Sequence, residues 1–233
     1  GADANERDGD GWTPLHHAMR TCNLAMVRTL YEYKCNLNAQ TGDGTTPLHV
    51  GCAAVRDGLE GEAEIAAMRA LLLLIGHGAN VHAADKKGRT PLHVAVGIIQ
   101  PHQSTIVQAL LMNGARPGAV DAEGMTPLML AAQIGHDAAV CALLDHGADP
   151  TTVGPDNLTA YDMAFSNHMA AAMELIAAHS RSGIHHAIRQ RNGNAFNHFS
   201  PLPTRAVDVR GRHVIHLCAL HDFLPGVQAV IDQ

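Results

Sequence analysis

The sequence predicts an all-α solenoid, a row of helix-turn-helix units from which β-turn or hairpin fingers protrude. Three observations lead to this prediction. A short motif of threonine, proline, leucine and histidine recurs along the 233-residue chain. The chain is rich in alanine and glycine but has only 1 Trp, 3 Tyr and 4 Phe, too few aromatic residues for a thick core. It also lacks the period-two runs of Val, Thr and aromatic residues that are typical of sandwiches and barrels.

The spacing of the motif sets the length of the unit. The motif reads TPLHHA, TPLHVG, TPLHVA and TPLMLA where it begins at Thr13, Thr46, Thr90 and Thr126, and weaker copies begin at Thr159 and His213. These starting positions differ by 33, 44, 36, 33 and 54 residues, so a 33-residue unit recurs with insertions of 11, 3 and 21 residues. The chain is therefore expected to be one domain, 1–233, with units at 8–40, 41–84, 85–120, 121–153, 154–207 and 208–233, the last cut short.

Each of the four full copies of the motif has the features of a helix start. The threonine hydroxyl caps free N–H groups, and proline fits the first turn, where its missing donor costs nothing. In the fourth unit, Ala131–Ala132 give the first helix a face of small side chains, and Gly135 makes the turn that follows. The second helix carries Val140 and Leu143–Leu144 inward and is stopped by Gly147. One such unit cannot bury its own apolar face, so stability has to come from contacts between neighbours.

The units close with leucines and a Gly-Ala pair, as in LLIGHGAN at 73–80, LLMNGAR at 110–116 and LLDHGAD at 143–149. With the pattern D-x-x-G-x-T-P-L-H-x-A, these segments resemble the ankyrin repeat family over nearly the whole chain, except residues 180–207. The resemblance implies an ankyrin-repeat solenoid that binds partner proteins on the concave side formed by fingers and first helices. Because the chain starts with GAD and stops within VQAVIDQ, we expect a fragment of a longer ankyrin-repeat protein.

Composition argues against several classes of partner and compartment. The net charge of -6 makes nucleic acid a poor partner. The longest apolar stretch, 66–75, is interrupted by Arg69 and is about half the length that spans a bilayer, so no membrane insertion is expected. The five cysteines are odd in number and lack a CxxC pair, which predicts free thiols in the cytoplasm, with the nucleus as an alternative. They are Cys22, Cys35, Cys52, Cys141 and Cys218.

The histidines and nucleophiles do not form a recognisable reactive site. Four histidines occupy the fourth position of the motif, where the ring is expected to hydrogen-bond the threonine and the backbone of a turn: His16, His49, His93 and His216. A zinc site made of His213, His216, Cys218 and His221 is not expected, because their spacing does not place them on one helical face. Cys52 and Cys218 are expected to be buried, inert thiols. We therefore expect no catalytic, metal or cofactor site, and no enzyme activity.

Three insertions depart from the repeat. Residues 55–65 are expected to be a solvated loop or a helix extension. Residues 97–105 contain Pro101, which forbids a continuous helix; Ile98 and Ile99 either pack under this loop or form a contact patch. The segment 180–207 has arginines and histidines but no acidic residue, so it is either an extended loop or a recognition arm for an acidic partner or a phosphate, anchored by Phe196 and Phe199.

The resemblance places partner-binding residues at the finger tips and on the first helices. These positions lie outside the packing pattern, so their side chains are free to make contacts. The candidates are Trp12, Arg20, Lys86, Lys87, Arg89, Ile98, Met125, Gln133, Ile134, Leu158, Arg210 and Arg212. Trp12 is expected either to anchor a partner or to pack against a preceding repeat. Lys86 and Lys87 either meet an acidic group or are an ordinary solvated tip.

The function that follows is a protein–protein interaction module, a scaffold or adaptor. We expect a monomer that binds another protein with an acidic segment facing the middle units. One alternative is a regulatory domain of a larger enzyme or channel whose activity lies outside this segment. Another is a substrate of an asparaginyl hydroxylase, because Asn38 in CNLNAQ matches the place that the family's targets use.

Overall fold

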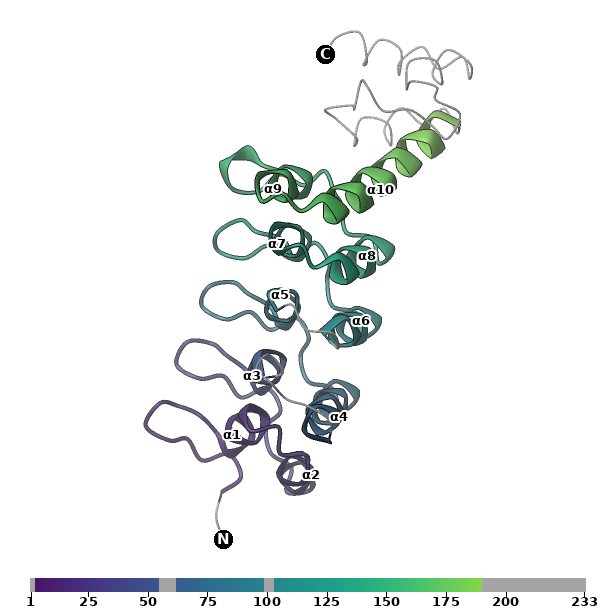
Figure 1. Cartoon of the computed structure of the whole chain (residues 1–233). Coiled ribbons are helices and arrows are strands. Elements are labelled where there is room, and N and C mark those ends of the chain that lie inside the picture. Colours follow the sequence, from purple (N-terminus) through teal and green to yellow (C-terminus); the bar gives the residue numbers. More distant parts are fainter. Residues whose placement is uncertain (1–2, 55–61, 99–102, 190–233) are drawn as a thin grey trace.

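The computed structural model describes residues 3–54, 62–98 and 103–189, and over this part of the chain five helix pairs are stacked in a row (Figure 1). The inner helices, which follow the fingers, are α1 (Pro14–Arg20), α3 (Pro47–Ala54), α5 (Pro91–Val96), α7 (Pro127–Ile134) and α9 (Ala160–Ser166). The outer helices are α2 (Leu24–Glu32), α4 (Glu62–Gly76), α6 (Gln103–Met112), α8 (Asp137–Asp145) and α10 (Ala170–Arg189). The described residues contain no strand, which confirms the all-α solenoid.

The Thr-Pro pairs start the inner helices as predicted. Thr13, Thr90 and Thr126 precede α1, α5 and α7 with extended backbones, at ψ 164°, 166° and 160°. Proline follows each of them in the first turn, where no backbone donor is needed. The pattern also ends helices: Gly135 stops α7 in the left-handed conformation, at φ 72°.

The core runs along the stack between neighbouring units. The motif leucines Leu15, Leu48, Leu92 and Leu128 are all at most 1% exposed, because each inner helix packs on the next. On α8 the predicted inward residues Val140, Leu143 and Leu144 are buried too. Tyr161 holds the leucine position in α9, the last inner helix of the described part, and is 39% exposed.

The fingers are turns that join the units by backbone hydrogen bonds. They are residues 8–12, 41–45, 85–89, 121–125 and 154–158, each closed by a bond from its first N–H to its last carbonyl. The N–H of Lys86 donates to Asp43, and the N–H of Ala122 donates to Lys87, both at 2.8 Å. This close approach requires glycine at the turn, since a Cβ on Gly88 would lie 2.8 Å from the Ala122 nitrogen.

Buried histidines form a second link between units. In the first three units the threonine N–H of the motif donates to histidine Nδ1, so the proton sits on Nε2 and is donated to a finger carbonyl of the next unit. The three bonds are His16 to Thr45, His49 to Arg89 and His93 to Met125, at 3.2, 2.9 and 3.2 Å. These contacts confirm the structural role predicted for the three motif histidines of the described part.

All three insertions contain helical residues where the structure describes them: α6 begins at Gln103, inside the 97–105 insertion. α4 begins at Glu62, so the end of the 55–65 insertion is helical. α10 runs to Arg189, so the loop expected from residue 180 is wrong for its first ten residues. The remaining residues of the first and last insertions, with Ile99, Pro101, Phe196, Phe199 and the predicted sixth unit 208–233, lie outside the described residues.

A first test of the packing is Leu143→Ala. Leu143 is fully buried, so the truncation should leave a cavity and lower the free energy of unfolding by about 2–5 kcal/mol. The control is Leu72→Ala on α4, where the leucine is 44% exposed and the expected loss is below about 1 kcal/mol. Urea unfolding followed by circular dichroism measures both. Equal losses in the two variants would contradict the assigned core.

A second test concerns pH. Burial lowers the pKa of His16, His49 and His93, and the carbonyl acceptors only partly offset it. Their contribution to stability is therefore complete above the unfolded-state pKa of about 6.5 and is lost as the pH falls toward the lower folded-state values. The free energy of unfolding should drop by up to about 1.4 kcal/mol per pH unit for each histidine that stays neutral in the folded state.

The control for the pH test is a substitution that another unit of this chain already contains. The fourth unit has Met129 at the histidine position, so His93→Met replaces one titrating group with a side chain that this motif already holds. Unfolding in urea between pH 7.5 and 5 should show a flatter pH dependence in the variant than in the wild type. Parallel pH curves would mean that His93 is not held neutral in the folded state.

Candidate functional site

All five fingers project from the same side of the stack, next to the inner helices (Figure 1). We call the finger tips and the adjoining ends of the inner helices the inner surface. Along it, one equivalent position from each inner helix forms a row: Arg20, Ala53, Gly97, Gln133 and Ser166. Most of these side chains are exposed, because the helices use their other faces for packing.

The third finger is organised around Asp85. Its carboxylate accepts the N–H groups of Lys87 and Arg89 at 2.9 Å and the Arg89 guanidinium at 2.8 and 2.9 Å. Burial acts to raise the pKa of Asp85, but these hydrogen bonds from Arg89 and Lys87 outweigh it and hold the pKa below its usual value. Arg89 is thus tied to its own finger, whereas Lys86 and Lys87 are exposed and form no ion pair within the described residues.

Trp12, at the first finger, packs within its own unit. The indole lies 5.3 Å from the ring centre of His17, and the guanidinium carbon of Arg20 lies 5.3 Å from the Trp12 ring. His17 Nε2 lies 2.7 Å from Asp8, a contact that lowers the pKa of this carboxyl group. Trp12 is half-buried by these neighbours, and Arg20 is exposed beside it.

The other predicted residues fall into three groups. Gln133 is exposed, and Ile134 and Leu158 are half-buried. Met125, predicted at a finger tip, and Ile98, predicted on a first helix, are buried, at 7% and 9% exposure, so neither side chain is exposed as predicted; the burial of Ile98 agrees with its other expected role, packing under the loop. Met125 belongs to the core cluster because the finger returns to the helix at this position and turns the apolar side chain inward. Arg210 and Arg212 lie outside the described residues.

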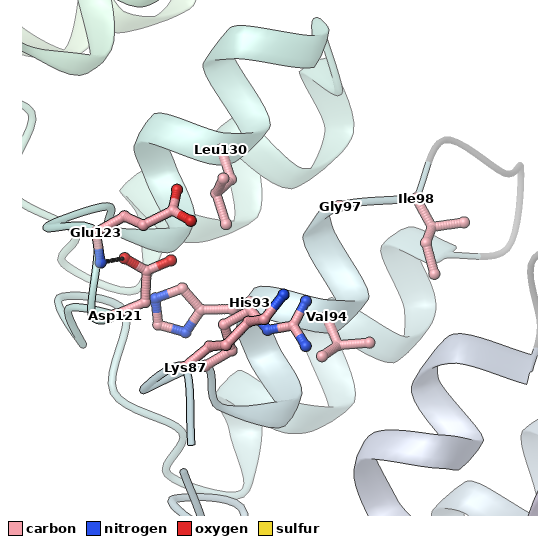
Figure 2. Close-up of a pocket in the computed structure, with 9 residues that line it drawn as sticks. Lys87, His93, Val94, Gly97, Ile98, Asp121, Glu123 and Leu130 are labelled. Atoms are coloured by element: carbon pink, nitrogen blue, oxygen red, sulfur yellow. Dashed lines mark hydrogen bonds between the residues drawn. The ribbon is translucent and has the colours of Figure 1, made fainter. Parts of the chain in front are cut away.

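A hollow of about 300 Å³ opens on the inner surface between the third and fourth units (Figure 2). Lys87 and Arg89 line one wall, and Asp121 and Glu123 line the other. The rest of the lining comes from the inner helices and the loop after α5, and consists of His93, Val94, Gly97, Ile98 and Leu130. A ligand in this hollow would therefore meet apolar groups between two walls of opposite charge.

Sequence reasoning identified Lys87 and Arg89 but missed the hollow itself. Glu123 and Gly97 are not among the residues predicted from the sequence. The signal that was available is the glycine: the equivalent positions hold Arg, Ala, Gln and Ser, and only Gly97 leaves its place without a side chain.

Asn38, the predicted hydroxylation site, is exposed and structurally engaged. Its side-chain oxygen accepts the N–H of Asn80 at 2.7 Å and thereby joins the first two units. Its own N–H donates to the Asn36 side chain at 2.9 Å. Its modification stays a prediction.

The described cysteines are not arranged for reaction. No disulfide joins Cys22, Cys35, Cys52 or Cys141, and burial raises the pKa of all four thiols, that of Cys52 to about 12. A thiol with a raised pKa is a poor nucleophile at neutral pH. Over the same part of the chain, no three His, Cys, Asp or Glu side chains group as metal ligands, and none of the helices has the length and apolar character needed to cross a bilayer.

Comparison with known proteins gives relatives of different lengths. The chain is 32% identical over 168 residues to a probable 26S proteasome regulatory subunit, p28, of Saccharomyces cerevisiae, a match that covers 70% of this chain and 67% of that protein. It is 29% identical over 165 residues to a probable serine/threonine-protein kinase of Dictyostelium discoideum, covering 70% of this chain and 18% of the kinase. Over 96 residues it is 38% identical to a probable E3 ubiquitin-protein ligase of Oryza sativa subsp. japonica, a match that covers 39% of this chain and 18% of the ligase.

The chain thus spans 18% of the length of the kinase and of the ligase. Ankyrin repeats are generally non-catalytic modules that bind other proteins. The family model described as ankyrin repeats (3 copies) matches residues 1–65, 63–154 and 98–190, the same region in which the helix pairs and fingers are described. The chain belongs to the ankyrin repeat family.

Proposed function

We propose that this chain is a protein–protein interaction module, a scaffold or adaptor, that binds a partner along the inner surface. The observation that carries the proposal is the state of the third finger. Its backbone is hydrogen-bonded to both neighbouring fingers and its Asp85 holds Arg89, so the finger is held in place without any contact from the side chains of Lys86 or Lys87. These two ammonium groups project from a fixed base into solvent and form no ion pair with any described residue.

The partner presents an acidic segment to the middle units. The chain as a whole has a net charge of -6, so its long-range field repels an acidic protein. Lys86 and Lys87 oppose this field locally, and charges at the rim of an interface act mainly on orientation and on the association rate. An acidic segment is thus directed to the third finger and away from the rest of the surface.

The same proposal assigns no reaction and no cofactor to the chain, which acts as a monomer in the cytoplasm or the nucleus. Ankyrin repeats are generally non-catalytic, and the described thiols have raised pKa values that suit buried, unreactive groups. The absence of a disulfide among the described cysteines supports a reducing compartment.

A regulatory domain within a larger enzyme is the second candidate function. The observation in its favour is that two relatives, a probable kinase and a probable E3 ubiquitin-protein ligase, are much longer than the matched region, which is 18% of each. The similarity to a probable proteasome regulatory subunit favours the first candidate, because the match there covers 67% of that protein. Catalytic or membrane-spanning segments beside these repeats in the full-length sequence would favour the second.

The test of the binding surface is the double variant Lys86→Ser/Lys87→Ser. Helicity and melting temperature should stay unchanged, because neither side chain is part of the packing. Affinity for the acidic partner should fall about three- to tenfold, the effect expected for two exposed charges. Arg89 is left in place because it is bound to Asp85. Quantitative capture from native lysate, followed by titration of the captured protein, measures the change.

The matched control is Arg28→Ser/Arg69→Ser, which removes two exposed cations from the outer helices α2 and α4. It changes the net charge by the same amount but leaves the inner surface intact. Equal losses of affinity in the two double variants would show an effect of net charge alone and would contradict binding at the third finger. A collapse of the melting temperature would show instead that the lysines are structural.

A further inference from the structure

One of the residues that line the hollow, at position 97, is a glycine. Gly97 has φ -68°, which any residue adopts, so the backbone does not require glycine here. A Cβ at this position would meet only the carbonyl oxygens of His93 and Val94, at 3.5 and 3.6 Å, which is ordinary contact. Neither strain nor crowding therefore accounts for the missing side chain. The absence of a side chain at Gly97 leaves space on the inner surface at the position where the next unit has Gln133.

One charge on each wall of the hollow is available to a ligand. Arg89 is paired with Asp85, and the Asp121 carboxylate accepts the N–H groups of Glu123 and Met125, each at 2.9 Å. Lys87 and Glu123 are exposed and have no ion pair with each other or with another described residue, although both line the same hollow. Figure 2 shows Lys87 on one side and Glu123 on the other.

The space between these charges is apolar and small. Val94, Ile98 and Leu130 contribute aliphatic groups to the lining. A volume of about 300 Å³ is at the lower end of the range for small-molecule sites, and the hollow is open along the inner surface, so it suits one inserted side chain better than an enclosed ligand. Insertion of one apolar side chain into such a space is also how interfaces place their anchors.

We propose that this hollow receives a single apolar side chain of an extended segment of the partner, with an acidic residue next to Lys87 and a basic residue next to Glu123. The proposal rests on the proposed function, because it takes the inner surface as the place where the partner lies. It adds a recognition rule: the segment carries opposite charges on the two sides of its apolar anchor. Either chain direction satisfies this rule, since the segment can reverse.

The probes are three capped peptides that differ only in the flanks of a central leucine. One has two glutamates on one side and two lysines on the other, the second has glutamates on both sides, and the third has lysines on both sides. Binding to the ¹⁵N-labelled full chain is followed from the amide shifts of Gly97 and Lys87, which detect weak complexes. The peptide with opposite flanks should bind best of the three and should shift both amides.

Gly97→Leu tests the hollow itself, because the new side chain fills the space. It should weaken the opposite-flank peptide about tenfold or more, the loss expected when an apolar anchor of leucine size is displaced. The control is Ser166→Leu, which adds the same side chain to the same row on α9, away from the hollow, and should leave binding unchanged. Melting curves confirm that both variants are folded.

Glu123→Gln tests the charge rule without filling the hollow. It should weaken the opposite-flank peptide but not the peptide with glutamates on both sides, so the preference between the two should shrink. If the opposite-flank peptide binds no better than the other two, or if Gly97→Leu leaves its affinity unchanged, the proposal is overturned. Binding that is lost in Lys86→Ser/Lys87→Ser but retained in Gly97→Leu would overturn the hollow and leave the proposed function intact.

Discussion

The hydrogen bond from a buried histidine to the finger of the next unit is the contact on which the rest of the stack depends. The ring is held from behind by a threonine N–H, which fixes the proton on Nε2, and it donates that proton forward to a carbonyl. Each of these carbonyls also accepts the N–H of the first residue of its own finger, so the histidine adds a second hydrogen bond, one that crosses between units. Each unit therefore sets the place of the next finger, and finger-to-finger backbone bonds such as Lys86 to Asp43 extend the same register to the tips.

The fourth unit shows what happens when this bond is absent. Met129 replaces the histidine; its sulfur lies 3.4 Å from the Thr126 nitrogen, but it has no proton to donate onward. The fifth finger adapts: a Cβ on Gly154 would lie 2.6 Å from the Met129 sulfur, so glycine makes room for the longer side chain. This finger also forms the short helix η1 (Pro155–Asn157), with φ 54° at Asp156. The fifth finger thus leaves room for the Met129 side chain packed beneath it.

Much of this architecture follows from the sequence, because its causes are local and repeated. The threonine, proline, leucine and histidine of the motif each have one task that the spacing reveals, and Leu143 and His93 lie where the pattern places them. The partner surface is less predictable. Arg89 and Met125 occupy the same finger position, yet Arg89 is exposed and Met125 is 7% exposed. Position in the repeat fixes where the backbone goes, whereas side-chain polarity decides whether the residue turns outward or inward.

The hollow was not predictable for a different reason. Its walls come from two fingers and its base from two inner helices, so it arises only when neighbouring units are stacked. Gly97 lines this space and has no side chain to fill it.

The residues that pack the units together and the residues exposed on the inner surface are separate sets, which explains how such a surface can acquire specificity for a partner. On α5 the residues Leu92, Ala95 and Val96 are fully buried and hold the unit against its neighbours. Gly97 ends the same helix with a backbone N–H that donates to His93 but has no side chain to pack, and Lys87 projects from a finger whose backbone is bonded to both neighbouring fingers. Substitutions at such positions cost the stack little free energy, because its cohesion comes from the opposite faces of the helices. The proposed recognition therefore depends on a few side chains, and on the absence of one at Gly97, at positions that the repeat itself does not constrain.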